Sequence, residues 1–550
     1  MSNPPAIAGG TDNSPAKNVN LHSLPERLSE LPEQGIFLYE GRKVSRRSYR
    51  EMLADVDAVE EKLTTWGVRA GMHVGILADN CYEWILYDLA LLHMRCVVVA
   101  FHPEQFANIS FSEAADRYDL QLLLTRKKFL QPSEPHHWMA TLDGDVDYKV
   151  RIRQPADNKL TNALNLESDV WTLVFSSGTS GVPKCLKISR VGTEKWIASC
   201  GHKFTFQPDD CMIVVLPFSN YQQRLMIYTA IWYGFDLALA EPARFLPALK
   251  DFKPTILAGP PAFYEIVENR FRNLSSAKQR LLLAVGWLIR NLSFGRLRQA
   301  LLRKWFAPLY DVFGPRVRIM LTGGAPSRQS TLELFASLGL PLYQVYGLGE
   351  TGFIALNLPG ANRLGSVGRP LFDDAVFIAD DGEIIVDYKQ PLCLGYLGCD
   401  AETVATTFLG SGRIATGDLG RFDSDGYLYI TGRKKQVIIT RAGYKLQPEL
   451  LEKEIEKSSD VSRAVVFGGG EMPVLMALIS LAVEDNSLNR QRVDAVIEKL
   501  NAKVPGPSRI GRIVFTDTQF TTDNGLLTRN LKLDRQGIYE KFRNSLLNGS

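Results

Sequence analysis

The stretch HVGILADNCYEWILYDLALLHMRCVVVAF, residues 73–101, decides the fold class. It opens with a short apolar run and continues with a segment whose apolar residues recur at helical spacing. It closes with a second apolar run, CVVVAF, that is rich in β-branched residues. A strand, a helix and a strand in this order are typical of a parallel α/β layer. The sequence therefore predicts an α/β fold.

Similar strands recur along the chain, and each ends in Gly, Ser or Pro: WTLVFSSG, CMIVVLPF, PTILAGPP and VRIMLTGG. Open α/β sheets bind their ligands at such carboxyl ends. Beyond about residue 360 the pattern changes to short strands with Asp-Gly turns, DDGEIIV, RIATGD and DGYLYITG, which predict a small antiparallel sheet or barrel. Past Gly432 a small α/β unit follows, with a helix in QPELLEKEIEKS and strands in AVVFGG, VLMALISLAV and RIVFTD.

Composition excludes several classes of protein. The net charge is 63 − 60 = +3, too small for a chain that coats nucleic acid. The seven cysteines form no C-x-x-C pair, which favours a reducing cytoplasm. No apolar run reaches the roughly 18 residues that span a bilayer. All seven histidines lie at or before His202, and no motif of a Ser-His hydrolase or an H-E-x-x-H metal site appears.

The first motif with chemical content follows the strand WTLVF. Hydroxyl residues and glycines let backbone N–H groups approach an oxyanion, and a lysine adds positive charge, which suits a polyphosphate. The spacing is not that of a Walker A loop, and an ordinary Gly/Ser turn with a surface lysine is the alternative. The residues are Ser176, Ser177, Gly178, Thr179, Ser180, Gly181, Val182, Pro183 and Lys184.

Three further motifs follow, and each alone is compatible with an ordinary turn or a solvent-facing cluster. Thr322–Pro326 and Tyr343–Glu350 place glycines, an aromatic face and a carboxylate at strand ends. Thr416–Leu419 with Gly432–Lys435 offers an aspartate and an arginine, which can hold two ribose hydroxyls. Asn524–Arg535 carries a lysine near the C-terminus.

Together, in this order, the motifs resemble the ANL superfamily of adenylate-forming enzymes over about residues 35–542. The resemblance is nearest to the long-chain fatty acyl-CoA synthetases, on segments such as LTGGAPSRQ, YGLGETG, GRKKQVIITRAGYKLQPELLE and NGLLTRNLKLDR. It implies a large N-terminal domain of stacked α/β sheets plus a small barrel-like sheet, with a small mobile C-terminal α/β domain. We expect a disordered leader at 1–21, the large domain at 22–432 and the small domain at 433–550.

The resemblance also implies roles for individual residues. ATP phosphates would lie against Ser176–Lys184, adenine against Gly323, Gly324, Ala325, Tyr346 and Gly347, and the ribose against Asp418 and Arg433. Glu350 would bind Mg²⁺, and Lys532 would reach the α-phosphate and the carboxylate. Lys435 would be the hinge, and Gly443 would border the tunnel for CoA. Arg224 matches an arginine of the long-chain enzymes.

Three positions depart from the family pattern. Gly349 replaces a threonine whose hydroxyl would contact phosphate, a hydrogen bond worth about 1.5–3 kcal/mol. The neighbouring Thr351 is a candidate substitute that the sequence alone does not establish. Asn220 replaces a histidine near the acid pocket, which leaves the choice of acid open. Cys185 replaces a glycine, and we interpret it as a packing residue rather than a reactive thiol.

The expected activity is an ATP-dependent acid–thiol ligase that forms an acyl-AMP, releases pyrophosphate and transfers the acyl group to CoA. A medium- or long-chain fatty acid is the leading substrate, expected to lie within Phe218–Tyr233, Pro260–Tyr264 and Leu348–Phe353. An aryl or terpenoid acid, a carrier-protein phosphopantetheine as acceptor, and a non-catalytic nucleotide- or acyl-binding homologue stay open. A monooxygenase of luciferase type shares every motif.

Residues 269–310 hold nine Lys or Arg, no Asp or Glu, and many large apolar residues. This composition is compatible with peripheral contact to an anionic membrane. The interpretation that we favour is a buried helix pair with a solvated basic face.

Overall fold

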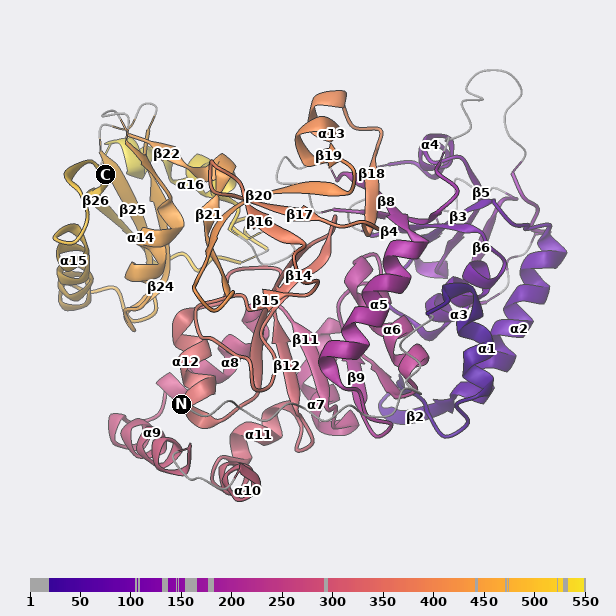
Figure 1. The fold of residues 1–550 in the computed structure, drawn as a ribbon, viewed down its shortest axis with the longest axis horizontal. Helices are drawn as coiled ribbons and strands as arrows, with labels where there is room; N and C mark the ends of the chain where they lie inside the picture. The colour runs from indigo at the N-terminus through magenta and orange to yellow at the C-terminus, as the bar shows by residue number, and fades with distance from the viewer. Residues whose placement is uncertain are drawn as a thin grey trace. The chain divides into compact units, whose positions relative to one another are not determined.

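The computed structural model describes residues 19–103, 106, 109–130, 137–144, 146, 148–153, 166–176, 183–290, 295–440, 444–469, 472, 474–521, 523–527 and 533–548. The chain forms two compact units (Figure 1). Unit 1 comprises Met1–Val174 and Lys187–Glu241, and unit 2 comprises Phe175–Leu186 and Pro242–Ser550. The strands β7 (Val170–Phe175) and β8 (Cys185–Ser189) carry the chain across the boundary between them.

Unit 1 contains two groups of paired strands. In the first, the order is β7-β4-β3-β5-β6 and every pairing is parallel, with β3 (His73–Leu77), β4 (Val97–Phe101), β5 (Leu120–Thr125) and β6 (Met139–Thr141). In the second, the order is β9-β10-β1-β2, with β9 (Cys211–Val214), β10 (Asp236–Leu239), β1 (Gly35–Glu40) and an antiparallel β2 (Lys43–Ser48). The predicted α/β order of residues 73–101 is confirmed.

The helices of unit 1 begin and end at residues that suit those positions. Helix α2 (Tyr49–Trp66) starts with a capping box between Ser48 and Glu51, and ends at Gly67, whose φ of 92° is a left-handed conformation that favours glycine. The other helices are α1 (Leu24–Ser29), α3 (Tyr82–His93), α4 (Phe111–Arg117), α5 (Arg190–Phe204) and α6 (Tyr221–Tyr233), with short turns η2 (Leu21–Ser23) and η3 (Lys127–Phe129). Leu21, the last residue of the expected leader, is buried in η2.

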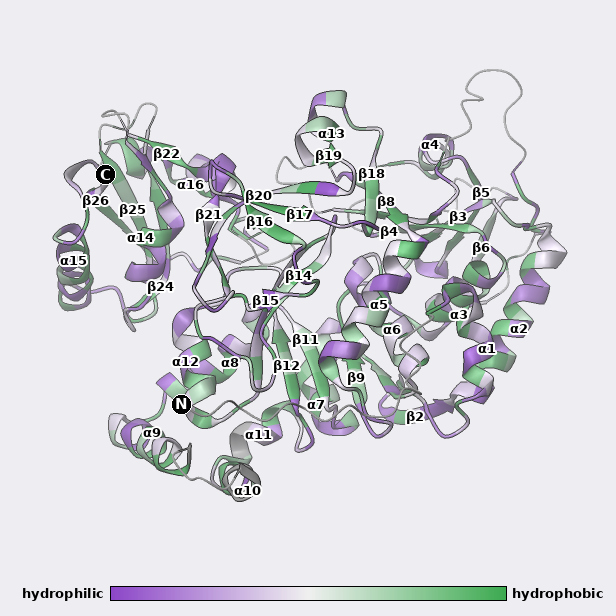
Figure 2. Cartoon of the chain, viewed as in Figure 1, coloured by the Kyte–Doolittle hydropathy of each residue, from purple (hydrophilic) through white to green (hydrophobic). Residues whose placement is uncertain are grey.

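Unit 2 opens with a sheet of order β11-β12-β13-β14-β15. β11 (Ile256–Gly259), β12 (Ile319–Thr322) and β13 (Leu342–Leu348) run parallel, and β14 (Gly352–Leu356) and β15 (Arg369–Pro370) turn back antiparallel. Figure 2 shows β11 and β12 as hydrophobic strands, as expected for strands covered on both faces. Helices α7 (Phe245–Phe252), α8 (Pro261–Arg272), α9 (Ser276–Arg290), α10 (Gly295–Trp305), α11 (Ala307–Phe313) and α12 (Gln329–Leu338) accompany them, after the turn η4 (Pro242–Arg244).

An antiparallel sheet follows, as the Asp-Gly turns predict. Its strands are β16 (Val376–Ile378), β17 (Glu383–Asp387), β19 (Phe408–Gly410), β20 (Arg413–Phe422) and β21 (Leu428–Arg433). Between β17 and β19 the chain forms β18 (Cys393–Leu397), a strand that pairs with β8, and α13 (Ala401–Thr407).

The C-terminal part of unit 2 has its own core. β24 (Val461–Phe467), β25 (Leu475–Leu481) and β26 (Ile510–Thr516) form a sheet. Side chains of β25 alternate between two clusters: Leu475, Ala477 and Ile479 pack with α14 (Pro448–Ile455) and α15 (Ser487–Asn501), whereas Met476 and Leu478 pack with α16 (Arg535–Asn548). This period of two explains why VLMALISLAV is apolar throughout. Short elements complete this part: η5 (Lys434–Gln436), β22 (Ile438–Ile439), β23 (Lys445–Leu446) and η6 (Gly506–Ser508).

Among the described residues, no helix combines the length and the apolar character that crossing a membrane requires.

Candidate active site

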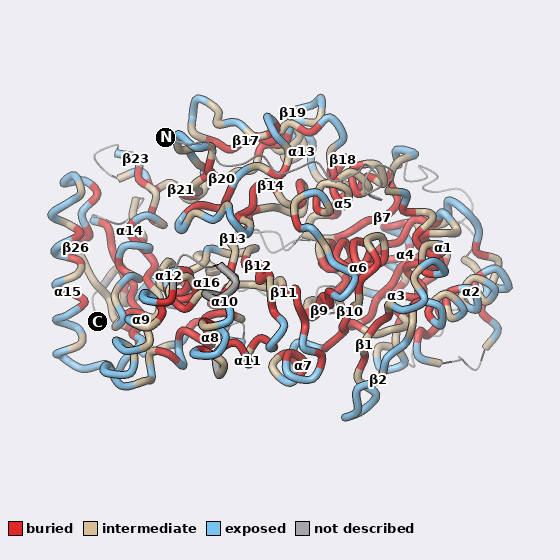
Figure 3. Tube along the Cα trace, turned by 60° about the horizontal axis from the view of Figure 1, so that its bottom comes forward, coloured by how far each residue is buried: buried red, intermediate tan, exposed pale blue. Residues whose placement is uncertain are grey.

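The parallel strands of unit 2 bring several predicted site residues to one edge. β11 and β12 end in register at Gly259 and Thr322, and the loop after β12 holds Gly323 and Gly324. A Cβ on Gly323 would lie 2.7 Å from Val345 Cγ2, so only glycine fits against β13 there. Gly324 has a φ of 76°, in the left-handed region. These two glycines are the ones expected to lie against adenine, and Figure 3 shows the strands leading to them as buried.

A second group of predicted residues meets around Asp418, which is buried at 4% exposure. β20 and β21 pair Asp418 directly with Arg433, whose Nε donates to Asp418 Oδ1 at 2.8 Å. The Tyr346 hydroxyl donates to Asp418 Oδ2, also at 2.8 Å. Tyr346 is itself buried, and burial followed by the charge of Asp418 raises the pKa of its phenol well above the ordinary value. The carboxylate expected to hold ribose is therefore fixed on both oxygens.

Glu350, the predicted metal ligand, contacts a residue that the sequence reasoning missed. The Tyr396 hydroxyl donates to Glu350 Oε1 at 2.7 Å, and the ammonium of Lys184 lies 4.6 Å from the centroid of the Tyr396 ring. Desolvation and then the charge of Glu350 raise the pKa of Tyr396, so it stays a donor. No local sequence motif marks Tyr396 as a site residue. It lies on β18, 46 positions after Glu350, and only the folded chain brings the two side chains together.

The turn η5, which holds the predicted hinge residue, is tied to the antiparallel sheet by Lys434. In η5, Lys434 Nζ lies 2.6 Å from both Asp381 Oδ2 and Glu383 Oε2. Glu383 Oε1 accepts from the backbone N–H of Gly417 at 2.8 Å, which connects this ion pair to the turn that presents Asp418. Lys435, the predicted hinge residue, follows directly.

Several predicted residues lie outside the described part of the chain: Ser177, Gly178, Thr179, Ser180, Gly181, Gly443 and Lys532. The ends of two of these segments are described. The backbone N–H of Ser176 donates to the carbonyl of Lys184 at 2.9 Å, and an antiparallel bridge joins Leu527 to Leu533. The described residues on either side of each segment are therefore paired with each other.

The structure shows the surroundings of the positions that depart from the family pattern. Thr351 is fully buried, and its hydroxyl accepts from Leu348 N at 3.2 Å and donates to Gly352 O at 3.0 Å. Because both interactions are made to its own loop, Thr351 does not replace the hydroxyl missing at Gly349. A Cβ on Gly349 would lie 3.3 Å from Leu186 Cδ2, a tight contact. Asn220 caps α6, accepting from the backbone N–H of Gln222.

The buried thiol of Cys185 fits the packing role expected of it.

Arg224 lies inside unit 1 and is paired there with a buried carboxylate. It is fully buried, and its Nη2 and Nε lie 2.6 Å and 3.2 Å from the two oxygens of Asp88. Burial alone would lower the pKa of Arg224, but the carboxylate of Asp88 raises it above its ordinary value. The Trp84 and Trp171 rings flank the guanidinium. This cluster stabilises the core of unit 1.

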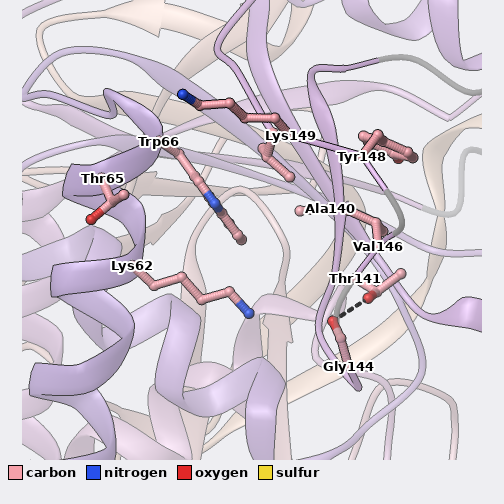
Figure 4. Close-up of a pocket in the computed structure, with 10 residues that line it drawn as sticks. Lys62, Thr65, Trp66, Ala140, Thr141, Gly144, Val146, Tyr148 and Lys149 are labelled. Atoms are coloured by element: carbon pink, nitrogen blue, oxygen red, sulfur yellow. Dashed lines mark hydrogen bonds between the residues drawn. The ribbon is translucent and has the colours of Figure 1, made fainter.

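A cavity of about 260 Å³ lies in unit 1, between α2 and the segment after β6. Figure 4 shows the Trp66 ring between the side chains of Lys62 and Lys149. The Thr141 hydroxyl donates a hydrogen bond to the carbonyl of Gly144. Of the predicted site residues that the structure describes, none lines this cavity.

Glu350 is a suitable partner for a magnesium ion that is also held by nucleotide phosphates. Mg²⁺ is usually bound through one or two carboxylates plus phosphate oxygens and waters, not by a complete protein cage. No cluster of three or more His, Cys, Asp or Glu with metal-ligand geometry occurs in the part of the chain that the structure describes. A single carboxylate whose orientation is fixed by Tyr396 fits this mode of binding.

Comparison with known proteins gives a consistent result. In an alignment of 552 positions the chain is 27% identical to the long-chain-fatty-acid–CoA ligase FadD15 of Mycobacterium bovis. The alignment covers 88% of this chain and 89% of the relative. It is 25% identical to the 2-succinylbenzoate–CoA ligase of Oceanobacillus iheyensis, covering 93% and 98%. The solved o-succinylbenzoate CoA synthetase of Bacillus subtilis, in complex with its acyl-adenylate, superposes with a TM-score of 0.69 at 19% identity, covering 94% and 97%.

Two family models match in tandem. The model of the AMP-binding enzymes matches residues 26–398, and the model of the AMP-binding enzyme C-terminal domain matches residues 435–546. The chain therefore belongs to the AMP-binding enzymes, the family of adenylate-forming enzymes that its sequence motifs resemble.

Proposed function

We propose that this chain activates a hydrophobic carboxylic acid, with a medium- or long-chain fatty acid as the leading candidate, and transfers it to CoA. The observation that carries the proposal is the pair of positioned carboxylates in unit 2. Asp418 is held by Arg433 and Tyr346, and Glu350 is held by Tyr396. In this proposal Asp418 accepts from the ribose hydroxyls and Glu350 meets a phosphate-bound cation.

The chemistry explains why these groups are needed. A carboxylate is a poor acyl donor, because its leaving group would be oxide. When a carboxylate oxygen attacks the α-phosphorus of ATP, pyrophosphate leaves and the acyl carbon gains AMP as a better leaving group. A thiol then attacks the acyl carbonyl and AMP departs. Two anions meet in the first step, so Lys532 and Lys184 have the role of neutralising negative charge. When bound, Mg²⁺ would supply further charge neutralisation on the phosphates beside Glu350.

Aromatic residues at the end of β11 support an apolar acid. The rings of Phe245 and Phe263 stack with centroids 4.1 Å apart. A Cβ on Gly259 would lie 2.4 Å from the Phe263 ring, so glycine allows this ring to lie over the strand end. Phe263 is only partly buried and belongs to the segment expected to line the acid pocket. We expect Phe263→Ala to raise KM for a long-chain acid more than KM for ATP.

The acid and the acceptor each have a second candidate. The 2-succinylbenzoate ligases among the relatives favour an aryl acid as the alternative substrate. Phosphopantetheine on a carrier protein is the alternative acceptor, because its thiol arm is the same as that of CoA. A location in the cytoplasm is part of the proposal, and the seven cysteines, none of them in a disulfide, support it.

Acid-dependent exchange of labelled pyrophosphate into ATP tests the first half-reaction. We expect exchange with one class of acid in a panel that varies chain length and ring content. Lys532→Ala should reduce exchange by orders of magnitude, while Lys541→Ala, a lysine on α16, serves as the matched control. ATP binding without exchange across the whole panel would favour a non-catalytic homologue. Oxygen uptake dependent on acid and ATP would favour luciferase-type chemistry.

A further inference from the structure

Helix α9 exposes large apolar side chains on the side turned away from its packing partner. Its inner side includes Gly286, which is so close to α12 that a Cβ there would lie 2.4 Å from Ser337 O. Ile289 is buried on the same side. With about 3.6 residues per turn, Leu281 and Leu288 share the opposite side of the helix. Both are 62% exposed.

Tryptophan side chains are exposed on both α9 and α10. Trp287 on α9 is 62% exposed, and Trp305 at the end of α10 is 58% exposed. α9 packs on α12 and on α10, and Figure 3 shows most of α9 as exposed. The expectation of a buried helix pair is therefore wrong for this side of α9, whereas the expected solvated basic residues are present. We call Leu281, Trp287, Leu288 and Trp305 the apolar patch.

Basic residues accompany the apolar patch, and no acidic residue occurs between Glu268 and Asp311. Lys278 and Arg280 are exposed on α9, and Lys304 is exposed beside Trp305. Arg303 donates to the carbonyls of Pro315 and Val317, so this arginine is used within the protein. The acidic group just before the segment, Glu268, is buried and paired with Arg272.

We propose that the apolar patch and its flanking basic residues bind the surface of an anionic lipid bilayer. An interfacial helix combines an apolar face that enters the acyl boundary with Lys and Arg that contact anionic headgroups. Tryptophan suits this boundary, because its ring is apolar and its N–H is polar. The absence of acidic residues over the whole segment removes the repulsion that anionic lipid would otherwise exert. This contact is separate from the chemistry at Glu350 and Asp418.

A vesicle-binding experiment with the full-length chain tests the proposal. Sedimentation with sucrose-loaded vesicles compares pure phosphatidylcholine with a mixture containing about one-third phosphatidylglycerol. We expect binding to the mixed vesicles, a blue shift of tryptophan fluorescence, and release at about 1 M salt, where the Debye length is about 3 Å. Lys278→Gln with Arg280→Gln should weaken binding about 25-fold, at about fivefold for each charge removed.

The apolar contribution is tested by Trp287→Ala with Leu288→Ala, which should weaken binding at least about tenfold. Leu488→Ala is the matched control, because Leu488 is 57% exposed on α15, where acidic residues are present. The proposal is overturned if the wild-type chain does not bind the vesicles, or if all variants bind them as tightly as the wild type. A second result would also overturn it: sedimentation velocity shows that the wild-type chain is a dimer, and the Trp287→Ala/Leu288→Ala variant is a monomer that still binds vesicles. Pyrophosphate exchange with a water-soluble acid is measured in parallel, so that loss of the enzyme activity is recognised separately.

Discussion

Replacing Tyr396 with phenylalanine removes one hydroxyl and leaves the ring beneath Lys184. In the structure this hydroxyl donates to Glu350 Oε1 at 2.7 Å. The ring, 4.6 Å from the Lys184 ammonium, stays in place in the variant. The substitution therefore separates the orientation of Glu350 from the cation–π contact with Lys184.

The expected magnitude comes from this single bond. A hydrogen bond to a charged group contributes about 1.5–3 kcal/mol. At about 1.36 kcal/mol for each factor of ten, kcat/KM for ATP should fall by roughly 10- to 150-fold. If Tyr396 acts by holding the metal-binding carboxylate, the concentration of Mg²⁺ needed for half-maximal rate should rise as well.

The assay is pyrophosphate exchange over a range of Mg²⁺ concentrations, with thermal unfolding measured on the same samples. Tyr388→Phe is a matched control, since Tyr388 is also buried in unit 2 and its hydroxyl donates to a backbone carbonyl, that of Phe353. A Tyr396→Phe enzyme with wild-type kinetics at limiting Mg²⁺ would refute the reasoning. A loss of activity matched by an equal loss of stability would assign Tyr396 a structural role instead.

The remaining predictions concern the ribose site and the stability of unit 1. Asp418→Asn places an amide against two donors, so kcat/KM for ATP should fall about 10- to 150-fold; less than a twofold change would contradict the assignment. Arg224→Ala leaves Asp88 buried without its partner, so chemical denaturation should show that the free energy of unfolding falls by about 3–5 kcal/mol. A fall of less than about 1 kcal/mol would mean that the buried pair contributes little to stability. The pKa of His93 is raised above its ordinary value: burial opposes the protonated form, but the carboxylates of Glu60 and Glu26 outweigh it. Protonated His93 therefore stabilises the folded protein at pH values below the pKa that His93 has in the unfolded chain. This contribution is lost as the pH rises through the pKa that His93 has in the folded protein. His93→Gln should lower the apparent Tm at pH about 5.5 and have little effect at pH about 9; an equal loss at both values would contradict this.

The sequence predicted the elements whose pattern is local. The strands around residues 73–101 and the Asp-Gly hairpins before Gly432 form as expected, because periodicity and turn residues act over a few positions. The meeting of Asp418 with Arg433 was also predictable from the motifs. Tyr396 was not, because its contact with Glu350 joins segments 46 positions apart, and no local pattern marks it.

Burial on the two sides of α9 was likewise beyond the sequence. The run LLLAVGWLI is apolar on every side, so composition alone did not show that Gly286 faces α12 while Leu281 and Leu288 face solvent. The role of Thr351, left open by the sequence, also depends on contacts that only the structure shows. A threonine beside a missing threonine invites the idea of substitution, but its hydroxyl is used by its own turn.

Isotope transfer tests the central claim most directly. The acid carries ¹⁸O in its carboxylate, and the enzyme is supplied with ATP, Mg²⁺ and CoA. If a carboxylate oxygen attacks the α-phosphorus, each turnover leaves one ¹⁸O atom in the AMP that is released, and pyrophosphate is unlabelled. Label in inorganic phosphate, together with formation of ADP, would mean attack at the γ-phosphorus and would contradict the account.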